Sequence, residues 1–396
     1  MAGPSADEAS LRVLGPARSE PLGVGLHADM VDPPAMRFRN SYWLLPCLVW
    51  CAQGCEKEQH EKSAEPVASV DKTAGIDPAL AKAVAAASAM AGRNAAPAGS
   101  GGPPPAGIFD PGAADAEIKK GAPPKITLGG TGSEPRVALG PLQPKPGFKT
   151  QGVVQLSVQG DPQQGPVPVQ LAITVEALKP KSAPTDAGPP APVTMSVKVV
   201  GAKLGITGVP PEMEARFTKL KGSKLEYQVS PDGAGSAYKT EIAAGAESAR
   251  DQLRQLTDVL ALITLPTPPQ PLGAGAFWMT TSREGVLGLD LVTYRMIKVE
   301  AVTGDLVTLS VGTKRYATSN RFDLDGLPPD APHDLAEFEC KSTAKVLLKV
   351  GTPFPQSGEV DSLLGASLLI PGQQGQQAQR GTLQIQSHAS LDFGKH

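Results

Sequence analysis

The chain has 396 residues, a formal net charge of -2 and only 4% aromatic residues. The near-neutral charge argues against nucleic acid as the main partner, because phosphate binding needs a concentrated basic face. The 43 glycines and 40 prolines are clustered, which indicates that part of the length is linker rather than packed core.

The first 35 residues show no hydrophobic period and carry scattered proline and glycine. The segment that follows them has the features of a signal peptide, and a signal peptide is expected to begin a chain. Met36 is therefore predicted to be the true start. Residues 1–35 are predicted to be a start-site misassignment or a disordered extension.

Residues 36–54 have the layout of a signal peptide. Arg37 and Arg39 precede an apolar stretch of about eleven residues, which is too short to cross a bilayer as a helix. Small residues then lead into Cys55. The alternative, a short buried apolar segment, fits poorly because a long linker follows.

The Ala52–Cys55 sequence resembles the lipobox of bacterial lipoproteins. The resemblance implies cleavage between Gly54 and Cys55, transfer of a diacylglycerol to the Cys55 thiol and acylation of the new amine. Two or three acyl chains give stable membrane anchoring, whereas one gives marginal binding. Glu56 follows the cysteine, and by the same resemblance a residue other than Asp favours the outer membrane.

Residues 55–124 are rich in Ala, Pro, Gly and Ser, and cannot bury enough apolar surface to offset the entropy of ordering. This segment is predicted to be a flexible tether, with a short alanine-rich helix near residues 77–91. We expect it to hold the body some tens of ångströms from the lipid, roughly 5–6 Å × √n for n residues.

From residue 125 onward the chain reads mostly as strands, because apolar and polar residues alternate with period two. Such alternation is typical of antiparallel sheets. The predicted strands are Gly152–Gln159, Val167–Leu178, Val193–Val200, Val286–Ala301, Asp305–Val311, Phe338–Val350 and Gly381–Phe393.

One segment has a helical period instead. Within Ala246–Ile263, an apolar stripe is formed by Leu253, Leu256, Leu260 and Ile263, with the charged residues elsewhere on the helix. Pro266 and Pro268 end the segment. We expect a single amphipathic helix, residues 246–264, lying across a sheet.

An internal duplication is predicted from four short segments that recur in the same order. Ile173–Ala177 is similar to Ile297–Ala301, Val193–Val197 to Val307–Val311, Gly208–Glu212 to Gly326–Asp330, and Lys224–Val229 to Lys345–Val350. The predicted fold is mainly β, with two duplicated antiparallel units, residues 125–245 and 265–396, on either side of the helix. The arrangement is a sandwich, a clam or a strongly curved sheet.

The stretch Pro268–Trp278 leads into the strand around Tyr294 with the sequence Pro-Pro-Gln-Pro-Leu-Gly-Ala-Gly-Ala-Phe-Trp. Over about residues 210–315 the chain resembles an uncharacterised family of β-rich bacterial lipoproteins. The resemblance implies an envelope location, and it brings no catalytic residues.

Few residues of the body are candidates for catalysis or metal binding. Cys340, the one cysteine of the body, is predicted to be a small buried hydrophobe rather than a catalytic thiol. His388 is predicted to be a plain strand residue. The Asp323–Gly326 run is similar to part of a calcium loop, but Arg321 and Pro332 occupy ligand positions, so a solvated acidic loop is favoured over calcium binding or a carboxylate pair. No metal site, cofactor or catalytic group is predicted.

Phe277 and Trp278 form a rare aromatic pair, predicted to pack in the core; the alternative is that they line a pocket for an apolar ligand. The leading hypothesis is a non-enzymatic envelope module, structural or protein-binding, attached to a membrane through Cys55. The second is a periplasmic carrier of a lipid or other apolar molecule, and an enzyme comes third.

Overall fold

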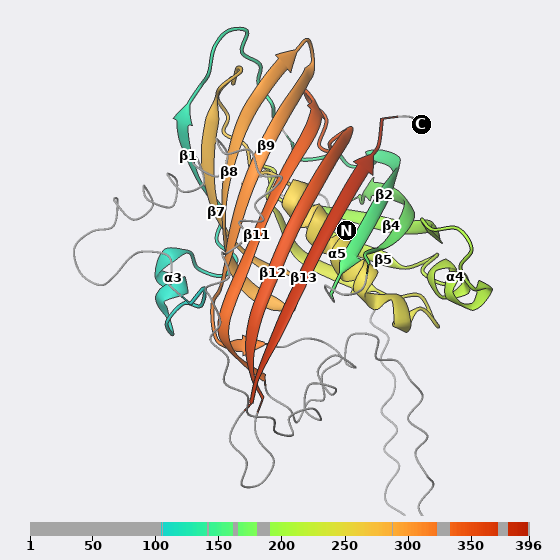
Figure 1. Ribbon diagram of the computed structural model, residues 1–396. Helices are drawn as coiled ribbons and strands as arrows, with labels where there is room; N and C mark the ends of the chain where they lie inside the picture. Colours follow the sequence, from blue (N-terminus) through green and yellow to red (C-terminus); the bar gives the residue numbers. More distant parts are fainter. Residues whose placement is uncertain are drawn as a thin grey trace, which may run out of the picture. The chain divides into compact units, whose positions relative to one another are not determined.

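A computed structural model describes residues 104, 106–140, 142–160, 165–179, 191–286, 288–322, 333–370 and 379–394. The predicted signal peptide, Cys55 and most of the predicted tether lie outside these residues. The described part is mainly β, as the sequence predicts (Figure 1).

Thirteen strands are described, and all belong to one sheet. They are β1 (Lys125–Gly130), β2 (Lys149–Gln159), β3 (Val167–Ala177), β4 (Val193–Leu204), β5 (Lys224–Val229), β6 (Gly235–Glu241), β7 (Phe277–Val286), β8 (Leu289–Thr303), β9 (Leu306–Ala317), β10 (Arg321–Phe322), β11 (His333–Lys349), β12 (Ser357–Ile370) and β13 (Gln379–Asp392). Their spatial order is β1-β7-β8-β9-β11-β12-β13-β2-β3-β4-β5-β6, and β10 pairs with β11. Every pairing between these strands is antiparallel.

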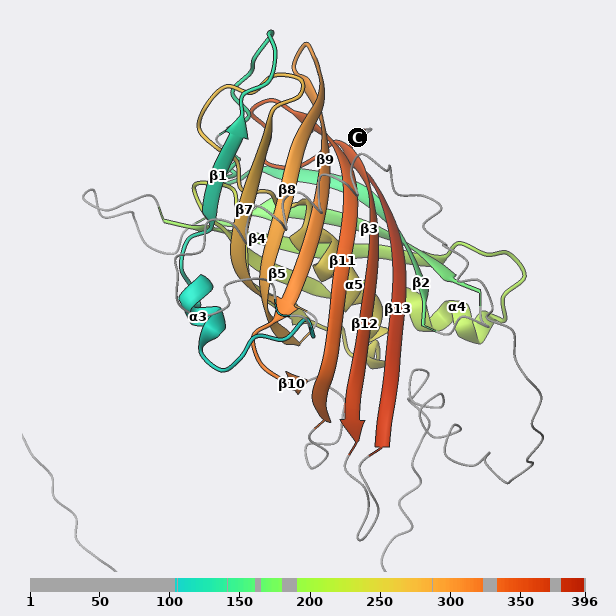
Figure 2. The same ribbon diagram turned by 60° about the vertical axis from the view of Figure 1, so that its left-hand side comes forward.

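The sheet curves strongly about helix α5 (Arg250–Ile263), so that β2–β5 pass across the opposite side of the helix from β7–β9 (Figures 1 and 2). A curved single sheet, one of the three arrangements expected, is therefore the one observed. The two halves of the sheet meet edge to edge where β13 pairs with β2. They match the two predicted units except for β1, which falls in the predicted unit 125–245 but pairs with β7 at the edge of the other half.

Alternate residues of each strand face the inside of the curve and form the main core. On β3 these are Val169, Leu171, Ile173, Val175 and Ala177, all buried. They pack in one cluster with inward residues of β8, β9 and β11 and with α5. Period-two alternation thus places one face of the sheet in the core, as predicted.

Helix α5 follows a short 3-10 turn, η1 (Glu247–Ala249), and is more deeply buried than predicted. The predicted stripe is buried, but so are all the residues from Leu256 to Ile263, Asp258 included. The helix is enclosed between two halves of the sheet rather than lying on one face, so its charged residues do not all reach solvent.

The prediction that the tether extends to residue 124 is wrong for its last part. Residues 106–109 lie between β9 and β11, where these strands diverge. Ala317 donates its backbone N–H to Gly107, Phe109 donates to Ala317, and Phe338 donates to Ala106, each at 2.9 to 3.0 Å. We call residues 106–109 the wedge. Helix α3 (Ala113–Glu117) follows and packs on the outer face through Ala114 and Ile118.

The second short helix, α4 (Pro211–Thr218), begins within the recurring segment Gly208–Glu212. Pro211 occupies the first helical position, where proline's fixed φ and missing N–H are tolerated. The corresponding segment, Gly326–Asp330, lies outside the described residues.

Strand order agrees with the predicted duplication, which nevertheless stays a prediction. The recurring segments lie on β3, β4 and β5 in the first half and on β8, β9 and β11 in the second, in the same neighbour order. Their registers differ: Ile173 is paired with Val199, whereas Ile297 is paired with Val311, the counterpart of Val197. A shift of two residues keeps every side chain on the same face.

Candidate functional site

A row of polar side chains crosses the inner face of the sheet. Cross-strand partners follow one another through Thr280 on β7, Arg295 on β8, Thr313 on β9, Ser342 on β11, Ser362 on β12 and Ser387 on β13. A second row beside it contains Ser282, Thr293, Arg315 and Cys340. We call these two rows the polar belt. It separates the main core from a second apolar cluster, which includes Leu291, Phe338, Leu364 and Leu368.

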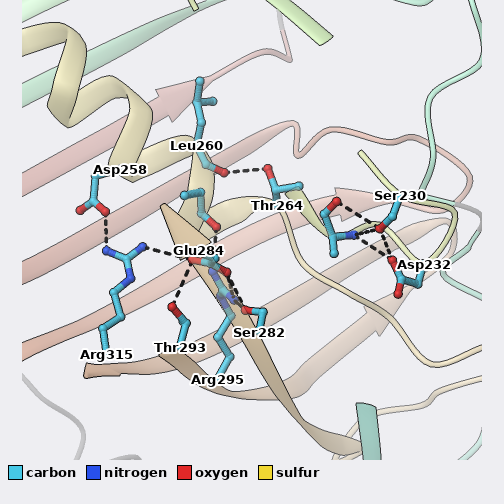
Figure 3. A network of polar contacts seen from close by, with 12 residues as sticks. Ser230, Asp232, Asp258, Leu260, Thr264, Ser282, Glu284, Thr293, Arg295 and Arg315 are labelled. Carbon is cyan, nitrogen blue, oxygen red and sulfur yellow. Dashed lines mark hydrogen bonds and ion pairs between the residues drawn. The ribbon is translucent and has the colours of Figure 1, made fainter. Parts of the chain in front are cut away.

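Four charged residues meet at the belt, and Figure 3 shows their contacts. Glu284 of β7 lies 2.6 Å from the Arg295 guanidinium and accepts hydrogen bonds from Ser282 at 2.6 Å and Thr293 at 3.2 Å. Arg315 of β9 donates to Asp258 of α5. Arg295 also donates to the Ala261 carbonyl of α5 at 3.1 Å. The network therefore joins three strands to the helix.

Burial makes these charges interact strongly. All four side chains are at most 8% exposed. Burial acts to raise the pKa of Glu284, but the guanidinium groups of Arg295 and Arg315 outweigh it and hold that pKa below its ordinary value. Burial acts to lower the pKa of Arg315, and the Asp258 carboxylate outweighs it, so that pKa is raised. Glu284 and Arg315 are thus charged at neutral pH.

This arrangement favours a structural role for the network over catalysis. A general base needs a pKa near the working pH, whereas Glu284 is held ionised and fully hydrogen-bonded. Several buried donors, Nε of Arg295 and Nε and Nη2 of Arg315, have no hydrogen-bond partner. They suit bridging water, which commonly satisfies buried polar groups.

Cys340 is buried among apolar residues of the second cluster, as predicted. Burial raises the pKa of its thiol to about 11, and the facing Arg315 opposes this only in part. The thiol is therefore protonated at neutral pH and is a poor nucleophile.

Trp278 packs in the core, as predicted. It is 0% exposed, and its indole N–H donates to the Pro266 carbonyl at 2.9 Å. Phe277 lies on the opposite face of β7, against Gly129, where an added Cβ would come within 2.0 Å of the Phe277 ring. The two rings therefore do not line one apolar pocket.

His388 is a strand residue on the outer face, as predicted, and its Nδ1 lies 2.8 Å from Asp361. Of the acidic region, Asp323, Asp325 and Asp330 lie outside the described residues. Glu337 and Glu339, on β11, form exposed ion pairs with Arg380 and Lys341.

The described ranges contain no cluster of three or more His, Cys, Asp or Glu side chains that could hold a metal ion. Within the same ranges, no helix is long and apolar enough to span a membrane. The predicted lipidation residue Cys55 and the cleavage site at Gly54 are outside the described part of the chain. A scan of protein-family models and a search of curated proteins found no match for this sequence.

Sequence reasoning missed the polar belt. Asp258 is one of the charged residues that the helical pattern places off the apolar stripe, and the sequence analysis does not single out Glu284 or Arg315. The sequence does contain a signal for the belt. Thr280, Ser282 and Glu284 alternate in phase with the apolar residues Trp278 and Val286, so all five side chains lie on the inner face of β7.

Proposed function

We propose that this protein is a lipid-anchored cell-envelope module that has no catalytic role and binds another protein. The observation that supports this best is the filled inner face of the sheet. Its charges are paired with one another, its thiol is protonated, and α5 with Trp278 occupies the space that a carrier would leave open.

An exposed apolar strip gives the module a surface for such a partner. It is formed where the inner face ends on β13, β2 and β3 and in the segment after β4. Val158 is paired with Val167 and with Ser387, and Ile206 lies two residues after the Val169–Leu204 pair, beyond the end of β4. We call Val158, Val167, Ile206, Leu383 and Ile385 the apolar rim. Val167 and Ile206 are 42% and 45% exposed, and the others are half-buried.

Photo-crosslinking in cells tests whether the apolar rim contacts another protein. A photoreactive residue in place of Ile206 is expected to give one crosslinked species of defined mass, and this species is expected to disappear when Val167→Asp is added. The matched control is Val200, which is 41% exposed on the outer face of β4. Equal crosslinking from both positions would show that the rim is not the binding surface.

Metabolic labelling with an alkyne analogue of palmitate tests the anchor. The label is expected on the full chain and is expected to be absent from Cys55→Ser. Cys51→Ser, which changes another cysteine of the same short segment, is expected to keep the label. Labelling that survives in Cys55→Ser would refute the proposed lipidation site.

A carrier of an apolar ligand is the second candidate. It is favoured by the continuity between the apolar rim and the second apolar cluster, because Leu383 and Ile385 pack against that cluster. Together they form an aliphatic surface beside the polar belt. Native mass spectrometry of the full chain in detergent separates the two candidates. A stoichiometric lipid-sized adduct that extracts into organic solvent would favour the carrier.

A further inference from the structure

Strand β13 extends beyond the strand that lies beside it. It pairs with β12 along its whole length, from Gln379 to Asp392, but with β2 only from Gln386 onward. Strand β2 ends at Gln159, and β3 then returns along its far side. The first half of β13, Gln379–Ile385, therefore borders no other described strand on that side, and in Figure 2 the ends of β12 and β13 project past β2. We call Gln379–Ile385 the open edge.

The backbone of the open edge has hydrogen-bonding groups that no described segment uses. Phe393, directly after β13, donates its N–H to Gln356, directly before β12. In an antiparallel ladder, residues alternate between those that bond one neighbouring strand and those that face the other side. By this alternation, the N–H and C=O groups of Arg380, Thr382 and Gln384 point away from β12. Within the described residues, these groups have no backbone partner.

The other exposed borders of the sheet are irregular or covered, whereas the open edge is regular. The β1–β7 pairing shifts register between Leu128 and Gly130, the β5–β6 pairing shifts further along the sheet, and the wedge fills the gap between β9 and β11. Bulges, prolines and charges commonly keep an exposed edge from pairing with another chain. The open edge has no register shift and no proline, and its one charged residue, Arg380, is paired with Glu337.

The side chains of the open edge suit a neighbouring strand in which aliphatic and polar residues alternate. Leu383 and Ile385 belong to the apolar rim and pack against the second apolar cluster. Val158, also of the rim, is the last residue of β2 on the inner face. A strand added beyond the end of β2 would place its inward side chains in line with Val158 and beside Leu383 and Ile385. Thr382 and Gln384 are exposed on the outer face, which favours polar neighbours there.

We propose that the partner binds by adding an extended segment to the open edge. This inference rests on the proposed protein-binding function and specifies how the partner is held. The main chain of an extended segment supplies N–H and C=O groups at the spacing of a strand, so it satisfies the open backbone groups of β13. Its alternate aliphatic side chains bury the apolar rim at the same time. The occupant is therefore a stretch of another protein in which aliphatic and polar residues alternate.

A proline at Gln384 tests the backbone contact in the full chain that carries the photoreactive residue at Ile206. Gln384→Pro removes an N–H that points to the open edge but leaves the hydrogen bonds to β12, and proline is tolerated at such edge positions. The variant is expected to keep its Tm and to lose the crosslinked species at least several-fold. Gln384→Ala, the matched control, retains the N–H and is expected to retain the crosslinked species.

Photoreactive residues at Thr382 and at Gln384, introduced one at a time, test the geometry without a proline. Side chains on one face of a strand recur every two residues. The two sites are therefore expected to crosslink to partner residues two positions apart, with an aliphatic residue between them. Mass spectrometry of the crosslinked peptides measures this spacing, whatever the effect of Gln384→Pro on folding.

The outcomes separate this inference from the function on which it rests. Crosslinking from Ile206 that persists in folded Gln384→Pro, or partner residues three or four positions apart, would overturn strand addition and leave the binding function in place. Lack of crosslinking from Ile206, Thr382 and Gln384 would overturn both. A crosslinked species of twice the mass of the chain would show that a second copy occupies the open edge, and would overturn the assignment to a different protein.

Discussion

At the scale of single residues, the buried ion pairs explain how α5 is held. Asp258 and Arg315 come from a helix and a strand, and each is nearly inaccessible to water. A buried pair adds little net stability compared with an apolar pair of the same shape, but removing one partner leaves an uncompensated charge. The network therefore fixes where the helix docks more than it strengthens the core.

Asp258→Ala is predicted to lower the free energy of unfolding by about 3–5 kcal/mol, because Arg315 loses its carboxylate partner. The measurement is urea unfolding of the full chain. The matched control is Asp251→Ala, on the same helix but 45% exposed, for which we expect less than about 1 kcal/mol. The double variant Asp258→Leu/Arg315→Met is expected to recover most of the loss. If it is no more stable than Asp258→Ala, the pair does not act as described.

The lowered pKa of Glu284 predicts that the folded chain loses stability in acid. Its pKa in the folded chain is below the ordinary value of 4.5, so its contribution is fully present above about pH 4.5 and is lost as the pH falls through the folded value. Glu284→Gln is expected to be less stable at neutral pH and to lose less stability on acidification. Glu337→Gln, an exposed ion-paired control, is expected to follow the unmodified chain. Parallel curves for Glu284→Gln and the unmodified chain would refute the assignment.

The ion pair between Asp258 and Arg315 could not be predicted from the sequence, because strand order decides which residues meet. Asp258 and Arg315 meet only because α5 is enclosed by the curved sheet. In contrast, the burial of Cys340 and Trp278 follows from local alternation, and both predictions are confirmed.

At the scale of elements, most strands with regular alternation were found, with ends shifted by a few residues. Strand β7 was largely missed because its inner positions Thr280, Ser282 and Glu284 are polar, which weakens the apolar period. Strand β12 was missed because apolar residues occupy both of its faces near Leu363–Leu364 and Leu368–Leu369. Helix α5 was found from its stripe, but its enclosure depends on the far half of the sheet.

The wedge offers a direct test of where the folded part begins. Gly107 has φ of +74°, and an added Cβ would lie 1.6 Å from the Phe338 carbonyl oxygen. Gly107→Ala is therefore predicted to displace the wedge and lower stability by more than the about 1–2 kcal/mol expected for a left-handed backbone alone. Gly112→Ala, with φ of +81° and nothing within 4 Å, isolates that backbone cost. Equal losses in the two variants would show that the wedge is not part of the stable fold.

At the scale of the whole described chain, the two halves of the sheet share one core. Residues of β3, β4, α5, β8 and β9 belong to the same apolar cluster, and β13 pairs with β2 across the junction. The sequence indicated two units of similar strand order, but it could not show that their edges join, since that pairing links the start of the body to its end.

Hydrogen exchange of the full chain in increasing urea is predicted to show one cooperative transition. Amides of β3 and β9 are expected to lose protection at the same urea concentration, because neither half buries its inner face without α5 and the other half. Peptides covering β6, an edge strand, serve as an internal comparison and are expected to exchange earlier. Persistent protection of β9 after β3 has exchanged would indicate two independently folding units.

The wedge and the β2–β13 pairing also determine the order in which backbone hydrogen bonds form during synthesis of the chain. The earliest described segment finds its hydrogen-bond partners in Ala317 and Phe338, and β2 finds its second neighbour only in β13. Synthesis supplies the N-terminal segments first, so they must wait, with unpaired backbone groups, until almost the whole body has emerged. Long-range pairing of this kind folds slowly and leaves strand edges open to other chains. Correct folding of the nascent chain therefore requires that its open strand edges do not pair with other chains before β13 has been synthesised.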